Sequence, residues 1–274
     1  MNVLSLFDGL SGGQIALERC GIKVDKYYAS EIDKSAILIT QYNYPNTIQL
    51  GDVTSVTKNS LENIDLLIGG SPCQGFSKLG VELNFEDHRS KLFFEYVRLL
   101  KELKPKYFML ENVVMQKESK DIITKYLGVE PILIDSALVS GQRRKRLYWT
   151  NIPNVVQPRD KGIIYKNVLE DLKWRDIPQF VYGKFGDNDR INGLNWINNS
   201  KSNTLTTNNS HTFQYLLNED KTKCRLMSAR EWERLQTLPE GYTDCLPKTK
   251  ACHAIGNGWT VDVIAHIFKA LKCI

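Results

Sequence analysis

The sequence predicts an α/β protein with a doubly wound sheet, and three features of the 274 residues carry this prediction. Short apolar runs with strand character alternate along the chain with segments of helical spacing, which is the pattern of βαβ units. Glycine-rich turns follow several of these runs, at the point where the carboxyl ends of parallel strands form ligand sites. A hydrophobic content of 42% is ample for a sizeable core.

Composition excludes several classes of protein. No apolar run approaches the roughly 20 residues of a membrane span, and no basic segment of an export signal precedes the first strand pattern, so we expect a cytoplasmic protein. The net charge of +5 fits a polyanionic partner, although many metabolic enzymes are equally basic. The cysteines have neither the spacing of zinc ligands nor that of a disulfide framework, so no metal is expected. They are Cys20, Cys73, Cys224, Cys245, Cys252 and Cys273.

The chain begins with a unit typical of nucleotide binding. Residues 2–7 alternate as a strand, and the glycine turn at 8–13 leads into a helix pattern that ends at Gly21. The turn lacks the full dinucleotide spacing, and a plain glycine turn is the alternative. Glu31 follows a second strand pattern, where an acid can accept from ribose hydroxyls, and Asp52 follows a third. A surface role is the alternative for Glu31, but acceptors at three consecutive strand ends predict an adenosine-containing cofactor.

A single thiol follows the next apolar run, residues 64–68. It lies in the sequence Gly-Gly-Ser-Pro-Cys-Gln-Gly at 69–75, where Pro72 fixes one backbone angle immediately before Cys73. Cys73 is therefore a candidate nucleophile, and an unreactive cysteine in a tight turn is the alternative. Residues 78–91 are polar and interrupted by glycine, which favours a mobile flap or a long solvated loop.

Three further elements follow this segment. Residues 92–103 repeat apolar side chains at helical spacing and predict a core-facing helix. Residues 107–110 predict a buried strand that ends at Glu111, whose carboxylate is costly to bury without a partner or a task. A helix at 121–127 and a strand at 131–135 complete this part of the chain.

The basic run at 142–146 precedes another strand pattern. Arg144 and Arg146 alternate there, so we expect them on one face of a strand that begins at this point, with both side chains in one site. A solvated basic face is the alternative.

In this order and spacing, the motifs resemble those of the DNA cytosine-5 methyltransferase family. Segments 111–114, 141–149 and 258–261 further resemble the animal de novo branch, whereas the Pro-Cys-Gln loop resembles the bacterial and phage enzymes. The resemblance implies a compact, single-module member with a Rossmann-like methyltransferase core. The motifs that carry it are residues 7–13, Glu31, Asp52, Pro72-Cys73-Gln74, Glu111-Asn112-Val113, Gln142-x-Arg144-x-Arg146 and Gly256-Asn257.

The resemblance implies S-adenosylmethionine as the cofactor. Phe7 would lie against the adenine, Glu31 on the ribose, and Asp52 at the edge of the base. The implied donor pocket consists of Phe7, Asp8, Gly9, Leu10, Gly12, Glu31, Ile32, Asp52, Val53, Gly70, Leu92, Asn257 and Trp259.

The resemblance also implies four catalytic residues. The thiolate of Cys73 would add to carbon 6 of cytosine, and Glu111 would support electron flow toward ring nitrogen 3. Arg146 would hold the carbonyl oxygen of the base, and Arg144 would stabilise the Cys73 loop and lower the thiol pKa. A stacked base is out of reach, so the cytosine must be flipped out, with residues 78–91 closing behind it.

The predicted domains are a catalytic domain, residues 1–153 with 254–274, and an inserted target-recognition domain, residues 154–253. A helix capped at Ser228 would organise the recognition region, and an amphipathic helix at 260–272 would return to the catalytic core. The candidate DNA-binding residues are Gln74, Ser77, Thr206 and Asn208.

The Thr-rich element bears on the DNA sequence that the protein would recognise. Residues 201–207 resemble the Thr-rich element of the family, which an Arg follows in the animal de novo branch, whereas Asn208 follows it here. Because the amide of Asn matches adenine better than guanine, a simple CG preference is not implied.

The expected partner is double-stranded DNA, in a bacterial or phage-infected cell, with a restriction endonuclease as a companion and the monomer as the favoured state. A transfer-RNA methyltransferase of the same family is one alternative, although its Cys-Phe-Thr element is missing. A non-catalytic DNA-binding relative would be expected to lose Cys73 or Glu111. An unrelated nucleotide-binding oxidoreductase explains the first hundred residues but not the combination of Glu111 with Arg146.

Overall fold

The structure is a computed structural model that describes residues 1–72, 88–176, 195–196, 201–205, 215–220 and 222–273. The chain forms two compact units. The first unit comprises Met1–Asp135, Lys145–Pro158 and Val263–Ile274, and the second comprises Ser136–Arg144 and Arg159–Asp262. The predicted domains are defined by function, so their bounds stay a prediction.

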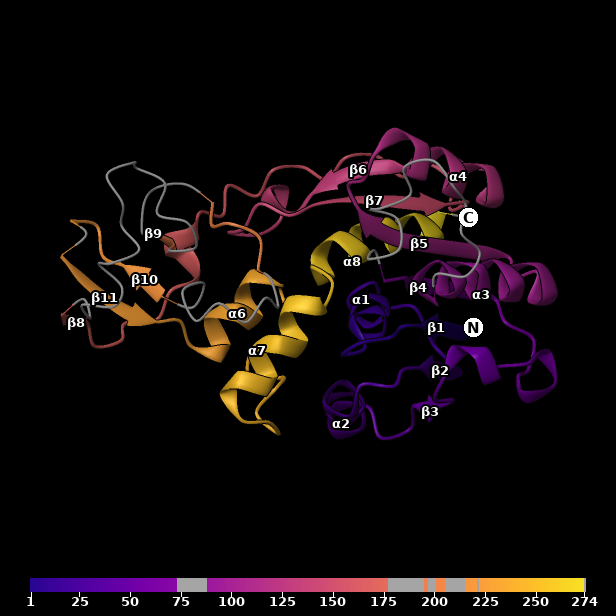
Figure 1. The fold of residues 1–274 in the computed structure, drawn as a ribbon, viewed down its shortest axis with the longest axis horizontal. Coiled ribbons are helices and arrows are strands. Elements are labelled where there is room, and N and C mark those ends of the chain that lie inside the picture. Colours follow the sequence, from indigo (N-terminus) through magenta and orange to yellow (C-terminus); the bar gives the residue numbers. More distant parts are fainter. Residues whose placement is uncertain (73–87, 177–194, 197–200, 206–214, 221, 274) are drawn as a thin grey trace. The chain divides into compact units, whose positions relative to one another are not determined.

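A seven-stranded sheet with the order β3-β2-β1-β4-β5-β7-β6 organises the first unit (Figure 1). The five strands from β3 to β5 are parallel, and β7 is antiparallel to both of its neighbours. The predicted doubly wound α/β fold is confirmed. The strands are β1 (Asn2–Leu6), β2 (Lys26–Ser30), β3 (Ile48–Gln49), β4 (Leu66–Gly70), β5 (Tyr107–Val113), β6 (Ile132–Asp135) and β7 (Lys145–Thr150).

Helices connect the parallel strands of this sheet. Because such crossovers are right-handed, α1 and α2 cover one face, while α3 and α4 cover the other. The strand order changes direction between β1 and β4, where the loops at the carboxyl ends of the two strands diverge and leave room for ligands. The helices are α1 (Gly12–Arg19), α2 (Lys34–Asn43), α3 (His88–Leu103) and α4 (Lys117–Leu127), with the 3₁₀ helices η1 (Val53–Ser55) and η2 (Lys58–Ser60).

Helix α3 begins earlier than the sequence predicts. The expectation of a loop through residue 91 is wrong, because the helix begins at His88. No glycine or proline interrupts the first turn, so the helix extends N-terminally from its buried apolar stripe. At the other end Lys104 has a φ of 48°, and Pro105 follows, which ends the helix.

One large buried cluster of the first unit lies between the sheet and the helices α3 and α4. A Cβ added at Gly69 would lie 3.0 Å from the Leu6 carbonyl oxygen and 3.1 Å from the Tyr96 ring, so this close packing requires glycine. Trp149 is fully buried, and its ring nitrogen donates to Thr124 at 2.9 Å. The buried cluster includes Leu4, Leu6, Leu67, Phe93, Tyr96, Leu110 and Trp149.

The last helix packs in the first unit from Val263 onward. Helix α8 (Val261–Lys269) continues into η7 (Ala270–Cys273), close to the predicted bounds. The thiol of Cys20, just after α1, donates to the Ala265 carbonyl at 3.1 Å, and burial raises the pKa of that thiol. Among the described residues, no helix combines the length and hydrophobicity that a membrane span requires.

The second unit contains a small four-stranded sheet with the order β8-β11-β10-β9. The predicted cap is confirmed: Ser228 accepts from the backbone N–H of Glu231, and the Glu231 side chain accepts from the N–H of Ser228. The elements are β8 (Arg175–Asp176), β9 (Asn195–Trp196), β10 (Tyr215–Leu217), β11 (Lys223–Leu226), α6 (Ala229–Leu235), α7 (Lys248–Asn257), η4 (Ser136–Leu138) and η5 (Tyr165–Val168).

Candidate active site

The loop after β1 has an unusual backbone. Phe7, Gly9 and Ser11 have φ values of 56°, 59° and 58°, in the left-handed region. A Cβ at Gly9 would meet no heavy atom within 4 Å. The left-handed backbone angle, and not a lack of room for a side chain, therefore favours glycine at this position. The Asp8 N–H donates to the Ser30 carbonyl at 3.2 Å, which holds the loop against the end of β2.

Asp8 is the buried acid of this loop. Its carboxylate accepts from the Tyr27 hydroxyl at 2.8 Å and from the Ser11 hydroxyl. Burial raises the pKa of Asp8 to about 6, although these two hydrogen bonds oppose the rise, and the nearby Glu31 adds to it. Asp8 therefore changes its charge just below neutral pH.

Glu31 connects the ends of β1 and β2. Its carboxylate accepts from three backbone N–H groups, those of Gly9 at 2.7 Å, Ile32 at 2.8 Å and Asp33 at 2.9 Å. A carboxylate offers about four acceptor positions, so capacity remains for a ligand hydroxyl.

The residues after β3 supply a further acid, Asp52, which is exposed. Asp52 accepts from the Thr54 N–H and hydroxyl, both at 2.8 Å, and the N–H bond holds the pKa of that carboxyl below its usual range. Ile32 is 71% exposed at the end of β2, and Val53 is buried. Carboxylates at neighbouring strand ends, with an exposed apolar side chain between them, fit an adenosine-containing cofactor.

Sequence reasoning missed one polar group at this edge. Gln49 is the last residue of β3, and both polar atoms of its side-chain amide are buried without a hydrogen-bond partner among the described residues. A buried amide without a hydrogen-bond partner carries a desolvation cost, which sets Gln49 apart from the other polar residues of this edge. The only sequence signal was a polar residue inside a short apolar run.

Strand β5 anchors the segment that follows β4. The amide of Asn112 is buried and donates to the carbonyl and the hydroxyl of Ser71, both at 3.2 Å, and Gly70 pairs with Glu111 in the sheet. Asn112 was not among the predicted site residues, although an amide within an apolar strand is a usable signal. The predicted residues Cys73, Gln74 and Ser77 follow directly but lie outside the described residues, as does the flap over 78–87.

Glu111 and Arg146 lie side by side on β5 and β7. The Arg146 Nε lies 3.0 Å from the Glu111 Oε1, and the two side chains are 15% and 12% exposed. In the antiparallel register Arg146 faces Val113, so Glu111 is its diagonal neighbour on the same face of the sheet. The structure therefore places side by side the two residues that the resemblance assigns to the same base, and their catalytic roles stay a prediction.

Arg144 does not share the strand of Arg146. That expectation is wrong, because β7 begins at Lys145 and Arg144 belongs to the second unit. Its buried guanidinium needs acceptors, and it donates to the carbonyls of Leu205 at 3.0 Å, Gly256 at 3.2 Å and Gly258 at 3.1 Å. Its action on the Cys73 loop stays a prediction.

The remaining predicted residues are distributed over both units. In the first unit Leu10 and Gly12 are buried, and the half-buried Leu92 packs on the core from α3. In the second unit Asn257 ends α7 and is exposed, and Trp259 is half-buried. The candidate DNA-binding residues Thr206 and Asn208 lie outside the described residues.

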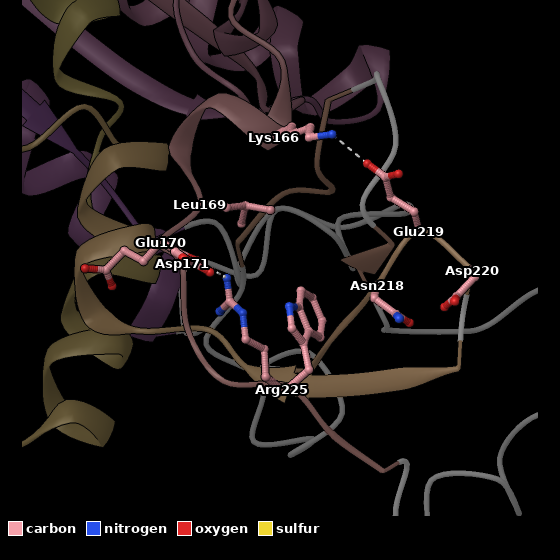
Figure 2. Close-up of a pocket in the computed structure, with 9 residues that line it drawn as sticks. Lys166, Leu169, Glu170, Asp171, Asn218, Glu219, Asp220 and Arg225 are labelled. Atoms are coloured by element: carbon pink, nitrogen blue, oxygen red, sulfur yellow. Dashed lines mark hydrogen bonds and ion pairs between the residues drawn. The ribbon is translucent and has the colours of Figure 1, made fainter.

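A cavity of about 590 Å³ lies in the second unit (Figure 2). The ammonium of Lys166 pairs with Glu219 at 2.6 Å, and the Arg225 guanidinium lies over the Trp174 ring at 5.1 Å. With four carboxylates and two cations in its lining, the cavity disfavours a DNA phosphate. The lining is Lys166, Leu169, Glu170, Asp171, Trp174, Asn218, Glu219, Asp220 and Arg225. In the part of the chain that the structure describes, no group of three or more His, Cys, Asp or Glu could hold a metal.

Comparison with known proteins gives a consistent result. The family model of C-5 cytosine-specific DNA methylases matches residues 1–148 and 135–273. The type II methyltransferase M1.ScrFI of Lactococcus lactis subsp. cremoris is 30% identical over 302 residues, covering 98% of this chain and 77% of the relative. The Entamoeba histolytica methyltransferase EhMeth has the same fold, with a TM-score of 0.80 at 19% identity over 100% of this chain and 98% of that structure.

Some relatives are much longer than this chain. The orphan methyltransferase M.Rho11sI of Bacillus phage rho11s is 44% identical over 179 residues, which cover 61% of this chain but 36% of the relative. The orphan methyltransferase M.SPRI of Bacillus phage SPR is 32% identical over 240 residues, 81% of this chain and 53% of the relative. With the match to the family model over nearly its whole length, the chain belongs to the C-5 cytosine-specific DNA methylase family.

Proposed function

We propose that the chain transfers a methyl group from S-adenosylmethionine to carbon 5 of a cytosine in a specific duplex DNA site, through a covalent adduct with Cys73. The observation that carries this proposal is the Glu111–Arg146 pair at the carboxyl end of the sheet. Asn112, next to Glu111, holds Ser71 and therefore the start of the segment that bears Cys73.

The thiolate of Cys73 starts the reaction. Carbon 5 of cytosine is a weak nucleophile, and addition of sulfur to carbon 6 converts the ring into an enamine that can attack an electrophilic methyl group. After the methyl group has been gained, loss of the proton on carbon 5 expels the thiolate and restores the aromatic ring. The target base leaves the stack for this chemistry.

Glu111 and Arg146 act on the polar edge of the cytosine. Glu111 supplies a hydrogen-bonded proton at ring nitrogen 3, where negative charge develops during addition, and accepts from the exocyclic amine. Arg146 donates to the carbonyl oxygen of the base, and its pairing with Glu111 fixes the position of both side chains.

Asp8, Glu31 and Asp52 bind the methyl donor in this proposal. Members of the family use S-adenosylmethionine, which supplies an electrophilic methyl group on a sulfonium. Glu31 accepts a hydrogen bond from the ribose of the donor and Asp52 accepts one from its adenine. Ile32 covers an apolar edge of the donor. Asp8, near the end of β1, lies at the methionine side of this pocket.

Duplex DNA is the proposed substrate, at a defined site longer than CG. The relative M1.ScrFI is a type II methyltransferase, so a restriction endonuclease is the proposed companion of this chain. Asn208 is the proposed contact to one base of the site.

A methyl-transfer assay tests this function. Purified protein is incubated with labelled S-adenosylmethionine and either duplex DNA or transfer RNA, and the labelled position is found by digestion and bisulfite sequencing. We expect 5-methylcytosine in the duplex DNA, and none with Cys73→Ser, because a hydroxyl is a far weaker nucleophile at neutral pH.

The matched control is Cys245→Ser, which alters a partly exposed free thiol in the second unit. This variant should keep full activity. Substantial transfer by Cys73→Ser, or methylation of transfer RNA in preference to DNA, would contradict the proposal.

A further inference from the structure

Two carboxylates share the loop after β1. Asp8 is 6% exposed and accepts from the hydroxyls of Tyr27 and Ser11. Glu31 lies close enough that its charge raises the pKa of Asp8 further. Among the described residues, no Lys, Arg or His forms an ion pair with either acid. The loop therefore holds negative charge that none of these residues balances.

The two acids differ in how their charge is stabilised. Glu31 accepts from three backbone N–H groups, whereas the donors to Asp8 are hydroxyls. Gln14 of α1 and Thr40 of α2 also donate to this loop, and both side chains are neutral. The N-terminus of α1 follows the loop directly, but a helix dipole supplies only roughly half an elementary charge. Ionised Asp8 therefore lacks a full countercharge from these elements.

A ligand with a positive charge would supply the missing countercharge. Burial makes an unbalanced charge costly, and it strengthens the attraction of that charge to an opposite one. S-adenosylmethionine carries a positive sulfonium. Its product S-adenosylhomocysteine has lost the methyl group and has a neutral thioether at the same place.

We infer that Asp8 is a specificity-determining residue, whose buried negative charge favours the sulfonium of the donor over the neutral thioether of the product. This inference deepens the proposed function and rests on it, because that function places the methionine side of the donor next to Asp8. The attraction is lost after methyl transfer, which favours the exchange of product for donor.

The protonation of Asp8 makes this preference depend on pH. Burial raises the pKa of Asp8 to about 6, and a bound sulfonium would lower it again by stabilising the ionised form. The affinity for S-adenosylmethionine should therefore rise between pH 5 and 7, as Asp8 becomes ionised in the free protein. The ammonium and the carboxylate of the amino acid occur in both ligands, so the ratio of the two affinities isolates the effect of the sulfonium.

The experiment measures this ratio by calorimetry at several pH values between 5 and 7, with the full chain. Asp8→Asn removes the charge with little change in shape. Tyr27→Phe keeps the charge but removes a hydrogen bond that lowers the pKa of Asp8. Asp65→Asn is the matched control, because Asp65 is a half-buried acid before β4 that accepts from the N–H of Asn2 at 2.7 Å, at the opposite end of the sheet.

In the wild type we expect the ratio of S-adenosylmethionine to S-adenosylhomocysteine affinity to rise about tenfold from pH 5 to 7, since one pKa unit corresponds to a factor of ten. In Asp8→Asn the ratio should stay at its low value at every pH. Tyr27→Phe should keep the rise and move it to higher pH, which a merely structural role of this hydrogen bond would not do. Asp65→Asn should behave as the wild type.

A wild-type ratio that is constant between pH 5 and 7 would overturn the inference, as would a pH-dependent ratio that persists in Asp8→Asn or disappears in Asp65→Asn. If Asp8→Asn does not fold, the comparison of Tyr27→Phe with Asp65→Asn carries the test, and an unshifted rise in Tyr27→Phe then overturns the inference. Wild-type protein that binds neither ligand at any pH would overturn the proposed function itself.

Discussion

Two side chains of neighbouring strands act on the polar edge of the target base in the proposed mechanism. The Arg146 Nε and the Glu111 Oε1 lie 3.0 Å apart, and both side chains are largely buried. Their position on adjacent strands makes the spacing a property of the sheet register rather than of a loop. Substitution of either should therefore change the chemical step more than the binding of the donor.

Glu111→Gln tests this expectation. The amide keeps the shape but cannot share a proton with ring nitrogen 3, so kcat should fall by about 10²- to 10⁴-fold while donor affinity stays the same. Steady-state kinetics and calorimetry measure the two quantities. Glu118→Gln, at an exposed position in the first turn of α4, is the control and should change neither. A kcat within threefold of the wild-type value would show that Glu111 takes no part in the chemical step.

Asp8 makes the stability of the first unit depend on pH. Burial raises its pKa in the folded protein to about 6, above its value of 3.8 in the unfolded chain. The folded state then binds the proton more tightly, so the contribution of Asp8 to stability is fully present below pH 3.8 and is lost as the pH rises through 6.

Asp8→Asn should remove this dependence. Relative to the variant, the wild type should lose about 1 to 2 kcal/mol of unfolding free energy between pH 5 and 7.5. Urea unfolding of both proteins across this range measures the difference. A constant difference would mean that Asp8 has an ordinary pKa.

Among the elements, the strand ends of β1, β2 and β3 form one connected edge. Glu31 accepts from Gly9 and from its own following residues, so it shapes the loop as well as facing the proposed ligand. Asp52 only caps η1 and is exposed. The two acids should therefore respond differently to substitution.

Both Glu31→Ala and Asp52→Ala should weaken S-adenosylmethionine binding, each by about 1 to 3 kcal/mol, because each removes an acceptor for the cofactor. Only Glu31→Ala should also lower the melting temperature clearly. Glu62→Ala, which breaks an exposed ion pair with Lys26, is the control for loss of surface charge. Unchanged affinity in both test variants would place the cofactor elsewhere.

The sequence predicted elements whose signal is local. The strand at residues 2–7, the cap at Ser228 and the helix at 92–103 depend on alternation, capping chemistry and helical spacing, which a single segment contains. The insertion of β7 between β5 and β6 was not predictable, because strand order depends on long-range packing. Arg144 was placed wrongly for the same reason, since its acceptors lie more than 60 residues away.

The site residues also differ in whether a single segment of sequence reveals them. Glu111 and Arg146 were recognisable from their motifs, whereas the sequence marks Gln49 and Asn112 only as polar residues in apolar strands, and their hydrogen-bond partners, or the lack of them, are visible only in the structure.

At the scale of the whole molecule, we expect the folding stability of the second unit to depend on a buried ion pair. Arg225 contacts both carboxylate oxygens of Glu231, at 2.5 and 2.9 Å, and neither side chain is more than 3% exposed. Arg225→Met would leave the Glu231 charge buried without this partner, which typically costs about 3 to 5 kcal/mol. Urea unfolding followed by tryptophan fluorescence should show this loss.

Arg230→Met is the matched control, because the Arg230–Asp244 pair is 39% and 55% exposed and should contribute about 0 to 1 kcal/mol. Equal losses in the two variants would mean that burial of the Arg225–Glu231 pair adds nothing.

The most direct test of the central claim traps the Cys73 adduct. A duplex with 5-fluorocytosine at the methylated position is incubated with protein and S-adenosylmethionine, and denatured complexes are digested and weighed by mass spectrometry. Fluorine replaces the proton whose loss from carbon 5 would expel the thiolate, and fluorine cannot leave as F⁺, so the thiolate stays bound after methyl transfer. We predict a denaturant-resistant complex whose mass places the modified nucleotide on Cys73, and none with Cys73→Ser. A preparation that methylates ordinary DNA but forms no such complex would contradict the covalent mechanism.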